Sequence, residues 1–334
     1  MSRLTATYEI EFARYVRARR AADDGLRYSA TIDGFDVEIV LIPNGGDRSR
    51  HADDTHETRA ITRISVSVSR DEDSAPPNIN INNEEQRDFT NRSTWFGQHS
   101  KEYQTVAVEA VNRMVRFCKY DLQIPNFREF HIHDTQFQNP KWTGADDSEL
   151  ASGVIEHSSE ILPPRGPGLV GEKDFTADHD ARLQYVLQND LSIETHQEFL
   201  ADAQTSIVNG KLPRAILEMA IACEVAIKQL FFRETTTAGA AYEYLERKGR
   251  VNVRAIILIH GVAKEVFGES FKDVERDAYV NIDLLFRSRN KVAHRGKAIY
   301  RDDVGKEHKV NRQCLEKWWS SIGLLMNWIA KHQG

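Results

Sequence analysis

The sequence is short of the residues that would build a disulfide framework or a membrane segment. Its three cysteines, Cys118, Cys223 and Cys314, are too few and too widely spaced for a set of disulfides or a zinc pair. No apolar run approaches the length of a membrane helix, which is about 18 uninterrupted apolar residues. Residues 1–20 also lack an apolar stretch followed by a cleavage site. The sequence therefore predicts a cytoplasmic protein with no membrane partner.

The chain also has little excess charge of either sign. Its formal net charge is -6, but the charge is unevenly distributed. Residues 1–174 carry 21 basic and 29 acidic residues, whereas residues 287–312 carry nine basic and three acidic ones, a local balance of +6. Because screening acts over about 8 Å, such a cluster can attract a polyphosphate even on an acidic protein. A solvated loop is the other interpretation.

The first half of the sequence predicts a small α+β domain. Alternating apolar residues on both sides of Asp33-Gly34, a dipeptide typical of tight turns, indicate a β-hairpin. The strongest strand pattern is Ile61 to Ser69, with apolar residues mostly on period two. The expected elements are helices over residues 7–21 and 101–119, strands over residues 26–31, 37–42, 61–69 and 129–137, and mostly loop over residues 70–100.

The second half predicts an all-α helical bundle. Residues 139–174 contain Pro163-Pro164 and Gly166-Pro167-Gly168, a composition typical of a linker. We therefore expect an α+β domain over residues 1–165 and a helical domain over residues 175–334. Long amphipathic patterns separated by short connections favour antiparallel packing. The expected helices cover residues 178–189, 193–208, 216–232, 238–248, 251–267, 276–292 and 313–331.

One motif near the end of a long helix has the residue types for chemistry on RNA. Arg289 and Asn290 are followed after three residues by His294, and Gly296 comes next but one. A histidine can move a proton at neutral pH, and an arginine can hold a phosphate in two-point contact. On a regular helix Arg289 and His294 would lie about 140° apart, so they converge only if the helix ends or bends, or if a second subunit contributes. The alternative is a helix C-terminus whose cations suit its dipole.

This motif resembles that of the HEPN family of helical ribonucleases, an arginine and a histidine separated by four to six residues. Arg289 to His294 matches with four intervening residues, and Asn290 is the polar residue often found after the arginine. The apolar stripe of residues 214–224 resembles an earlier core helix of such domains, and Trp318-Trp319 falls in the expected closing helix. The resemblance covers about residues 180–334.

The resemblance implies a homodimer in which two bundles form one composite cleft and cut RNA without a metal or another cofactor. Arg289 would stabilise the scissile phosphate, His294 would act as acid or base, and Asn290 would orient one of them. We add phosphate-guiding roles for Arg287, Lys291, Arg295 and Lys297 from the local charge. Many members are toxins or antiviral defence proteins that attack tRNA or other RNA, with activity in abortive infection. The N-terminal domain would then be a sensor or restraint, with its own regulatory partner or trigger.

Two other classes of function remain open at this point. Some members of the family bind without cutting, so the bundle could be a binding module for RNA, a nucleotide or a protein. A purely structural dimerisation bundle would need the apolar stripes alone.

Several weaker constellations have structural explanations of equal or greater weight. His51, Asp53, Asp54 and His56, and separately His131 and His133, are metal-ligand types, but an exposed loop and a half-exposed strand explain them as well. Glu218 and Glu224 lie at the edge of an apolar helix face, where charged residues are the default. Glu224 could instead act in the cleft or restrain an arginine. Trp318-Trp319 could stack bases, although core or dimer packing is the better explanation.

Overall fold

The computed structural model describes most of the chain as two compact units. The described residues are 2–20, 26–50, 57–74, 86–151, 173–189, 193–233 and 253–333, with residues 239, 241, 244 and 248. The first unit comprises residues 1–122, 126–167 and 173–191, and the second comprises residues 123–125, 168–172 and 192–334. The expected boundary near residue 165 falls outside the described residues. The expected helix over residues 178–189 is present, but it packs with the first unit rather than with the bundle.

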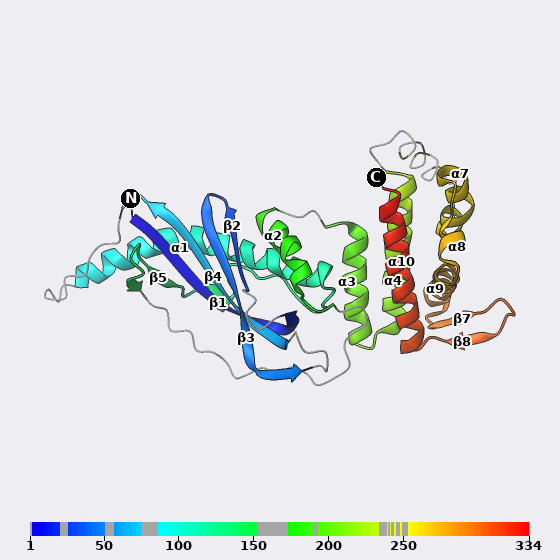
Figure 1. The fold of residues 1–334 in the computed structure, drawn as a ribbon, viewed down its shortest axis with the longest axis horizontal. Coiled ribbons are helices and arrows are strands. Elements are labelled where there is room, and N and C mark those ends of the chain that lie inside the picture. Colours follow the sequence, from blue (N-terminus) through cyan, green and yellow to red (C-terminus); the bar gives the residue numbers. More distant parts are fainter. Residues whose placement is uncertain are drawn as a thin grey trace. The chain divides into compact units, whose positions relative to one another are not determined.

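The first unit is built on a six-stranded antiparallel sheet (Figure 1). The strand order is β2-β3-β4-β1-β5-β6, and the β2–β3 hairpin turns at Asp33-Gly34, where both residues have positive φ. The strands are β1 (Ser2–Arg20), β2 (Arg27–Ile32), β3 (Phe35–Arg50), β4 (Glu57–Glu72), β5 (Lys141–Thr143) and β6 (Glu149–Ala151). The expected hairpin and the strand at Ile61 are therefore confirmed.

The helix expected over residues 7–21 is wrong, because residues 7–20 belong to β1; residue 21 is not among the described residues. Its buried side chains alternate along the chain, and β1 pairs with β4 over most of its length. The pairing register with β4 shifts between Glu11 and Val16. The buried residues stay on even positions on both sides of this shift, so Tyr8, Phe12 and Val16 also stand at the four-residue spacing of a helix. The buried residues on the core face are Leu4, Ala6, Tyr8, Ile10, Phe12, Val16 and Ala18.

Two further expectations for the first unit are corrected. The expected loop over residues 70–100 contains the first turns of α1 (Gln86–Arg116), which continues into a π-helical turn at Phe117–Asp121. The expected strand over residues 129–137 is a turn followed by a 3-10 helix, Thr135–Phe137. The Asp134 carboxylate accepts a hydrogen bond from the His131 N–H at 2.9 Å, which closes the turn locally.

The helices α1 and α2 (Asp180–Gln188) pack on the sheet. Tyr103, Val111 and Met114 of α1 are fully buried, and the Tyr103 ring meets that of Phe35 edge-on. The opposite face of the sheet is polar. There the hydroxyls of Thr5 and Ser69, and of Thr7 and Ser67, pair across strands at 2.9 Å. These four hydroxyl side chains line the bottom of an open groove with a volume of about 890 Å³.

The second unit is the expected helical region, with a short β-hairpin that the sequence did not predict (Figure 1). Helices α4, α9 and α10 pack against one another, and α3 packs on α4. Their bounds are α3 (Thr195–Val208), α4 (Leu212–Phe231), α6 (Ala255–Ile257), a π-helical turn (Leu258–Val262), α7 (Ala263–Phe267), α8 (Phe271–Val274), α9 (Arg276–Arg295) and α10 (Arg312–Lys331), and the hairpin is β7 (Ile299–Arg301) with β8 (Glu307–Lys309). Most of the helix expected over residues 238–248 lies outside the described residues.

One apolar core joins these helices. The expected stripe on α4 is buried at Ile216, Met219 and Cys223. Trp318 and Trp319 of α10 are also buried, at 2% and 9% exposure, so core packing rather than base stacking accounts for them. The three cysteines of the chain are free.

Candidate nucleic-acid site

Helix α9 carries the expected motif and stays α-helical through it. Gly296 follows in the left-handed conformation with φ 64°, and its N–H donates to the Val292 carbonyl oxygen at 2.8 Å, an arrangement typical of a helix C-terminus. Because the helix does not end between Arg289 and His294, the five-residue step keeps them about 140° apart around the axis. Within one chain, the two side chains therefore leave the helix on different faces.

The conformation of Gly296 makes it a testable helix stop. Replacing it with alanine is expected to destabilise the second unit by about 1 kcal/mol, the penalty of a Cβ in the left-handed region. Crowding is not the reason, since no heavy atom lies within 4 Å of the added Cβ. Gly323→Ala is the matched control, because Gly323 is exposed within α10 with the same free space. It is expected to stabilise by about 0.5–1 kcal/mol, so thermal unfolding should separate the two by sign.

Arg289 lies at the contact between α9 and α4. Its Nη2 is 3.4 Å from Oε2 of Glu224, and its Nη1 donates to Oδ1 of Asn290 at 3.3 Å. The other carboxylate oxygen of Glu224 is 3.4 Å from Nζ of Lys228. About a third of the Arg289 side chain is exposed. The guanidinium is thus held by Glu224 yet is open on one side, which is the restraint on an arginine that the position of Glu224 in the sequence had suggested.

Asn290 and His294 lie one helical turn apart on the exposed side of α9. This side is opposite the buried stripe, which consists of Ala278, Ile282, Leu285, Ser288 and Val292. Asn290 also contacts Arg289, so it connects the two faces of the helix. No hydrogen bond or ion pair joins the His294 side chain to another described residue. The imidazole is therefore accessible to a substrate or to a second subunit.

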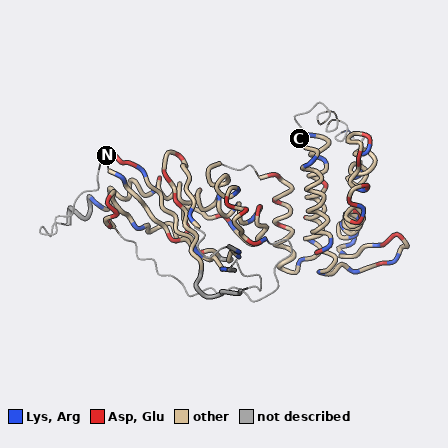
Figure 2. Tube along the Cα trace, viewed as in Figure 1, with Lys and Arg blue, Asp and Glu red and all other residues tan. Residues whose placement is uncertain are grey.

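The nine basic residues of the segment 287–312 divide into two groups. Four form ion pairs with carboxylates, and they are Arg287, Arg289, Arg301 and Arg312. No described carboxylate pairs with the other five, which are Lys291, Arg295, Lys297, Lys306 and Lys309. Figure 2 shows both signs of charge interleaved along the hairpin. The five unpaired cations therefore carry the local attraction for phosphate, and they include three of the four expected phosphate guides.

Arg287, the fourth expected guide, has a structural contact instead. It lies 2.5 Å from Asp283 and 2.8 Å from Asp303, and it donates to the Arg301 carbonyl oxygen. Burial lowers its pKa, but the two carboxylates outweigh burial and hold the pKa above its usual value. Arg287 thereby fixes the hairpin to the outer side of α9, one turn from Asn290, and its charge is already neutralised.

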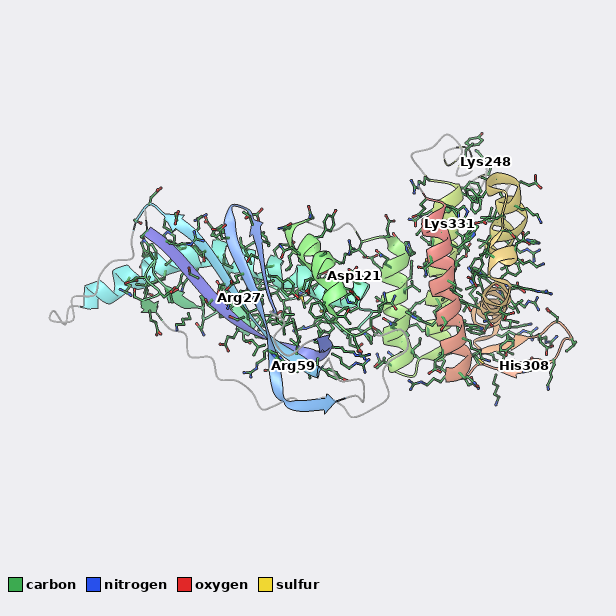
Figure 3. The ribbon with its side chains drawn as sticks, viewed as in Figure 1. Arg27, Arg59, Asp121, Lys248, His308 and Lys331 are labelled. Atoms are coloured by element: carbon green, nitrogen blue, oxygen red, sulfur yellow. The ribbon has the colours of Figure 1, made fainter. Side chains whose placement is uncertain are left out.

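The hairpin itself is closed by Asp302. One carboxylate oxygen accepts from the N–H groups of Val304 and Lys306, and the other lies 2.8 Å from Nε2 of His308. Figure 3 labels His308 on the hairpin. The hydrogen bond with His308 is the main reason that the pKa of Asp302 lies below its usual value. The Asp302-Asp303 pair followed by Gly305, with φ 83°, was the available turn signal in the sequence.

The contrast between Arg287 and Lys291 can be measured. Arg287→Ala is expected to release the hairpin, so that the amide of Asp302, which donates to the Lys306 carbonyl oxygen, exchanges faster with solvent. Lys291→Ala removes the same charge from the same helix without touching the hairpin. It should leave this exchange unchanged and should reduce the salt dependence of RNA binding by about 0.7 in log–log slope. Equal amide exchange in the two variants would contradict the assignment of Arg287.

The weaker candidates take structural positions or fall outside the described residues. Glu218 is buried, where it accepts from the Ser206 hydroxyl at 2.7 Å and pairs with Arg214 at 2.6 Å. His131 and His133 lie on the turn before Thr135 rather than on a strand face. Among the described residues, no group of three or more His, Cys, Asp or Glu is placed to hold a metal. The cluster from His51 to His56 is not among them.

Helix α9 thus brings Asn290 close to both Arg289 and His294, and five unpaired cations follow along the last turns of the helix and the hairpin. Within the described part of the chain, no helix has both the length and the apolar character needed to cross a bilayer. Comparisons of the chain with protein-family models, with curated proteins and with solved structures return no match.

Proposed function

We propose that the chain is a metal-independent endoribonuclease of the HEPN type. The observation that carries this proposal is the exposure of His294 and Asn290 together with a partly exposed Arg289 near the end of α9. Five unpaired cations lie on the last turns of this helix and on the segment that follows it. An acid–base group, a phosphate ligand and a path for a polyanion are the three components that RNA cleavage without a metal requires.

In the proposed reaction, neutral His294 takes the proton from a ribose 2′-hydroxyl, and the 2′-oxygen attacks the adjacent phosphorus. The bond to the 5′-oxygen breaks, and this oxygen takes the proton that His294 gained, which leaves a 2′,3′-cyclic phosphate and a 5′-hydroxyl. Arg289 neutralises the charge that builds on the phosphate. For this it must leave Glu224, 3.4 Å away, and Asn290 supplies an alternative acceptor during that movement.

A second copy of the chain would complete this site. Arg289 and His294 act on the same phosphate, while within one chain their side chains lie about 140° apart around the helix. Two α9 helices facing each other would bring two arginines and two histidines into one cleft. We therefore propose a homodimer joined through the helical unit, with the first unit as a regulatory or recognition domain.

The setting of this activity follows from the resemblance to the HEPN family. We propose a cytoplasmic toxin or anti-phage defence protein that acts on host or viral RNA, with tRNA among its substrates. A trigger acting through the first unit would release the activity.

Binding without cleavage is the second candidate. Two observations favour it: Arg289 is occupied by Glu224, and no described side chain orients the His294 ring. In catalytic sites a histidine is commonly oriented by a hydrogen-bonded partner. A binding module would retain the cations and lack the turnover.

One experiment separates the two candidates. The purified protein is incubated with total cellular RNA in EDTA, and the products are tested for 2′,3′-cyclic phosphate ends. Cleavage that is lost in both Arg289→Ala and His294→Ala supports the ribonuclease. Cleavage that persists in both variants rejects the site, and retained RNA binding with no cleavage by the unmodified chain identifies a binding module.

A further inference from the structure

One end of the sheet is formed by the last residues of β1 and β3 and the first residues of β4. These residues carry an unusual concentration of arginine. Residues 12–20, 42–50 and 57–63 contain eight arginines, two acidic residues and no lysine. They lie in the half of the chain whose overall balance is -8. We refer to these three segments as the arginine ribbon. The arginines whose side chains the structure describes are Arg17, Arg19, Arg59 and Arg63.

The sheet register brings the three segments side by side. Arg17 lies opposite Ala60 and Arg59 opposite Ala18 on the β1–β4 pair, and β3 pairs with the other edge of β4. Arg59 lies near the start of β4 (Figure 3). On the outer edge of β1, the Arg19 N–H donates to the Phe175 carbonyl oxygen at 2.9 Å. Neighbouring strands lie about 4.8 Å apart, so the backbone brings these arginine-rich segments together at one end of the sheet.

Three of these arginines project away from the core. Arg17 and Arg19 alternate with the buried Val16 and Ala18, and Arg63 stands between the buried Thr62 and Ile64. Two carboxylates, those of Asp174 and Glu11, lie near these arginines.

Arg17 pairs with Asp174, and Glu11 lies opposite Arg63 in the register. No ion pair joins Arg19 or Arg63 to a described carboxylate. Arg19 is exposed and Arg63 is half-buried, so both guanidinium groups retain donors for a ligand.

The residue type and the extent of the ribbon point to an extended polyanion. Arginine forms bidentate hydrogen bonds with phosphate and is less strongly hydrated than lysine, and the ribbon uses arginine alone. Nine residues of β1 span about 30 Å at strand spacing, which is longer than a single nucleotide. We propose that the arginine ribbon binds the phosphodiester backbone of an RNA strand, independently of base sequence. The proposal concerns the first unit and does not depend on whether the second unit cuts RNA.

The test measures RNA binding by the full chain with His294→Ala as background, so that the RNA stays intact. A fluorescent single-stranded RNA of random sequence is titrated by anisotropy at several KCl concentrations. Arg19→Gln with Arg63→Gln is expected to reduce the slope of log affinity against log salt by about 1.4, and to lower the affinity on the order of tenfold at 0.1 M KCl. Unchanged circular dichroism and thermal unfolding exclude a folding defect.

The control carries the same change of charge at the other end of the same unit. Arg3 lies opposite Asp71, far along β1 from Arg19. Lys101 is exposed on α1, two residues before Tyr103. The Tyr103 hydroxyl donates to the Leu4 carbonyl oxygen, which places this part of α1 beside the start of β1. Arg3→Gln with Lys101→Gln should keep the slope. Equal losses in the two double variants, or no loss in the ribbon variant, would overturn the proposal. So would displacement of the RNA by a nucleoside triphosphate at equal phosphate concentration. Stronger displacement by single-stranded DNA than by single-stranded RNA of the same length would reassign the ligand to DNA.

Discussion

Replacing His294 with alanine is expected to lower the rate of RNA cleavage by about 10²–10⁴-fold, the range for losing a general acid or base. The fold should not change, because the side chain is exposed and makes no hydrogen bond with a described residue. The measurement is the rate of cleavage of an end-labelled RNA in EDTA, with thermal unfolding of both proteins alongside. RNA affinity should fall far less than the rate, since the unpaired cations remain.

His308 provides the matched control. It is the other histidine of the α9 and hairpin region, and it differs from His294 in having a carboxylate partner, Asp302, at 2.8 Å. If His294 is the acid–base group, the His308→Ala variant should cleave RNA at a rate within a few-fold of that of the unmodified protein. The opposite result, with His308→Ala inactive and His294→Ala active, would move the catalytic group to the hairpin and reject the motif assignment.

The long helices α3, α4, α9 and α10 of the second unit could be predicted closely because their signals are local. Pro213 lies in the first turn of α4, and Gly296 follows the last residue of α9. Between such ends, the apolar residues of each helix recur at steps of three and four and form one buried stripe. A helix of this kind is specified by its own residues, so the packing of the bundle confirms the pattern without altering it.

The first unit was harder because its strands depend on distant partners. Residues 7–21 carry apolar side chains at both two-residue and four-residue spacing, and only the pairing with β4, some 60 residues later, selects the strand. The pairing register also shifts between Glu11 and Val16, and the side-chain pattern of β1 does not reveal this shift because the buried residues stay on even positions. Sequence periodicity is then ambiguous, and tertiary pairing decides the structure.

The candidate site shows the same limit. The motif residues, the cluster of cations and the position of Glu224 can all be read from the sequence, but their partners cannot. Arg287 was an expected phosphate guide from charge alone, and its two carboxylates come from one turn earlier on α9 and from the hairpin tip. Charge counts treat every cation alike, whereas the structure separates neutralised cations from those that remain available to a ligand.

Mixing two inactive variants is expected to restore cleavage, and this is the strongest test of a composite site. Arg289→Ala and His294→Ala should each be inactive alone, because each homodimer lacks one group entirely. If a site takes its arginine from one chain and its histidine from the other, a heterodimer keeps one complete site of two. In a pure heterodimer half of the sites are complete, so roughly half of the unmodified activity should return to the doubly tagged dimer. The variants are co-expressed with different tags, and the doubly tagged dimer is purified and assayed.

The angle between the two side chains explains why this outcome discriminates. A site built within one chain would need Arg289 and His294 to reach one phosphate from positions about 140° apart on an unbroken helix. In that case every chain of the heterodimer would still lack one group, and the doubly tagged dimer would be as inactive as the two homodimers. A pairing of Arg289→Ala with Arg289→Ala,His294→Ala is the matched control, since no arrangement of those chains supplies the arginine. Recovery in this control would mean that Arg289 is dispensable, whereas recovery confined to the complementary pair would require that two chains share the site.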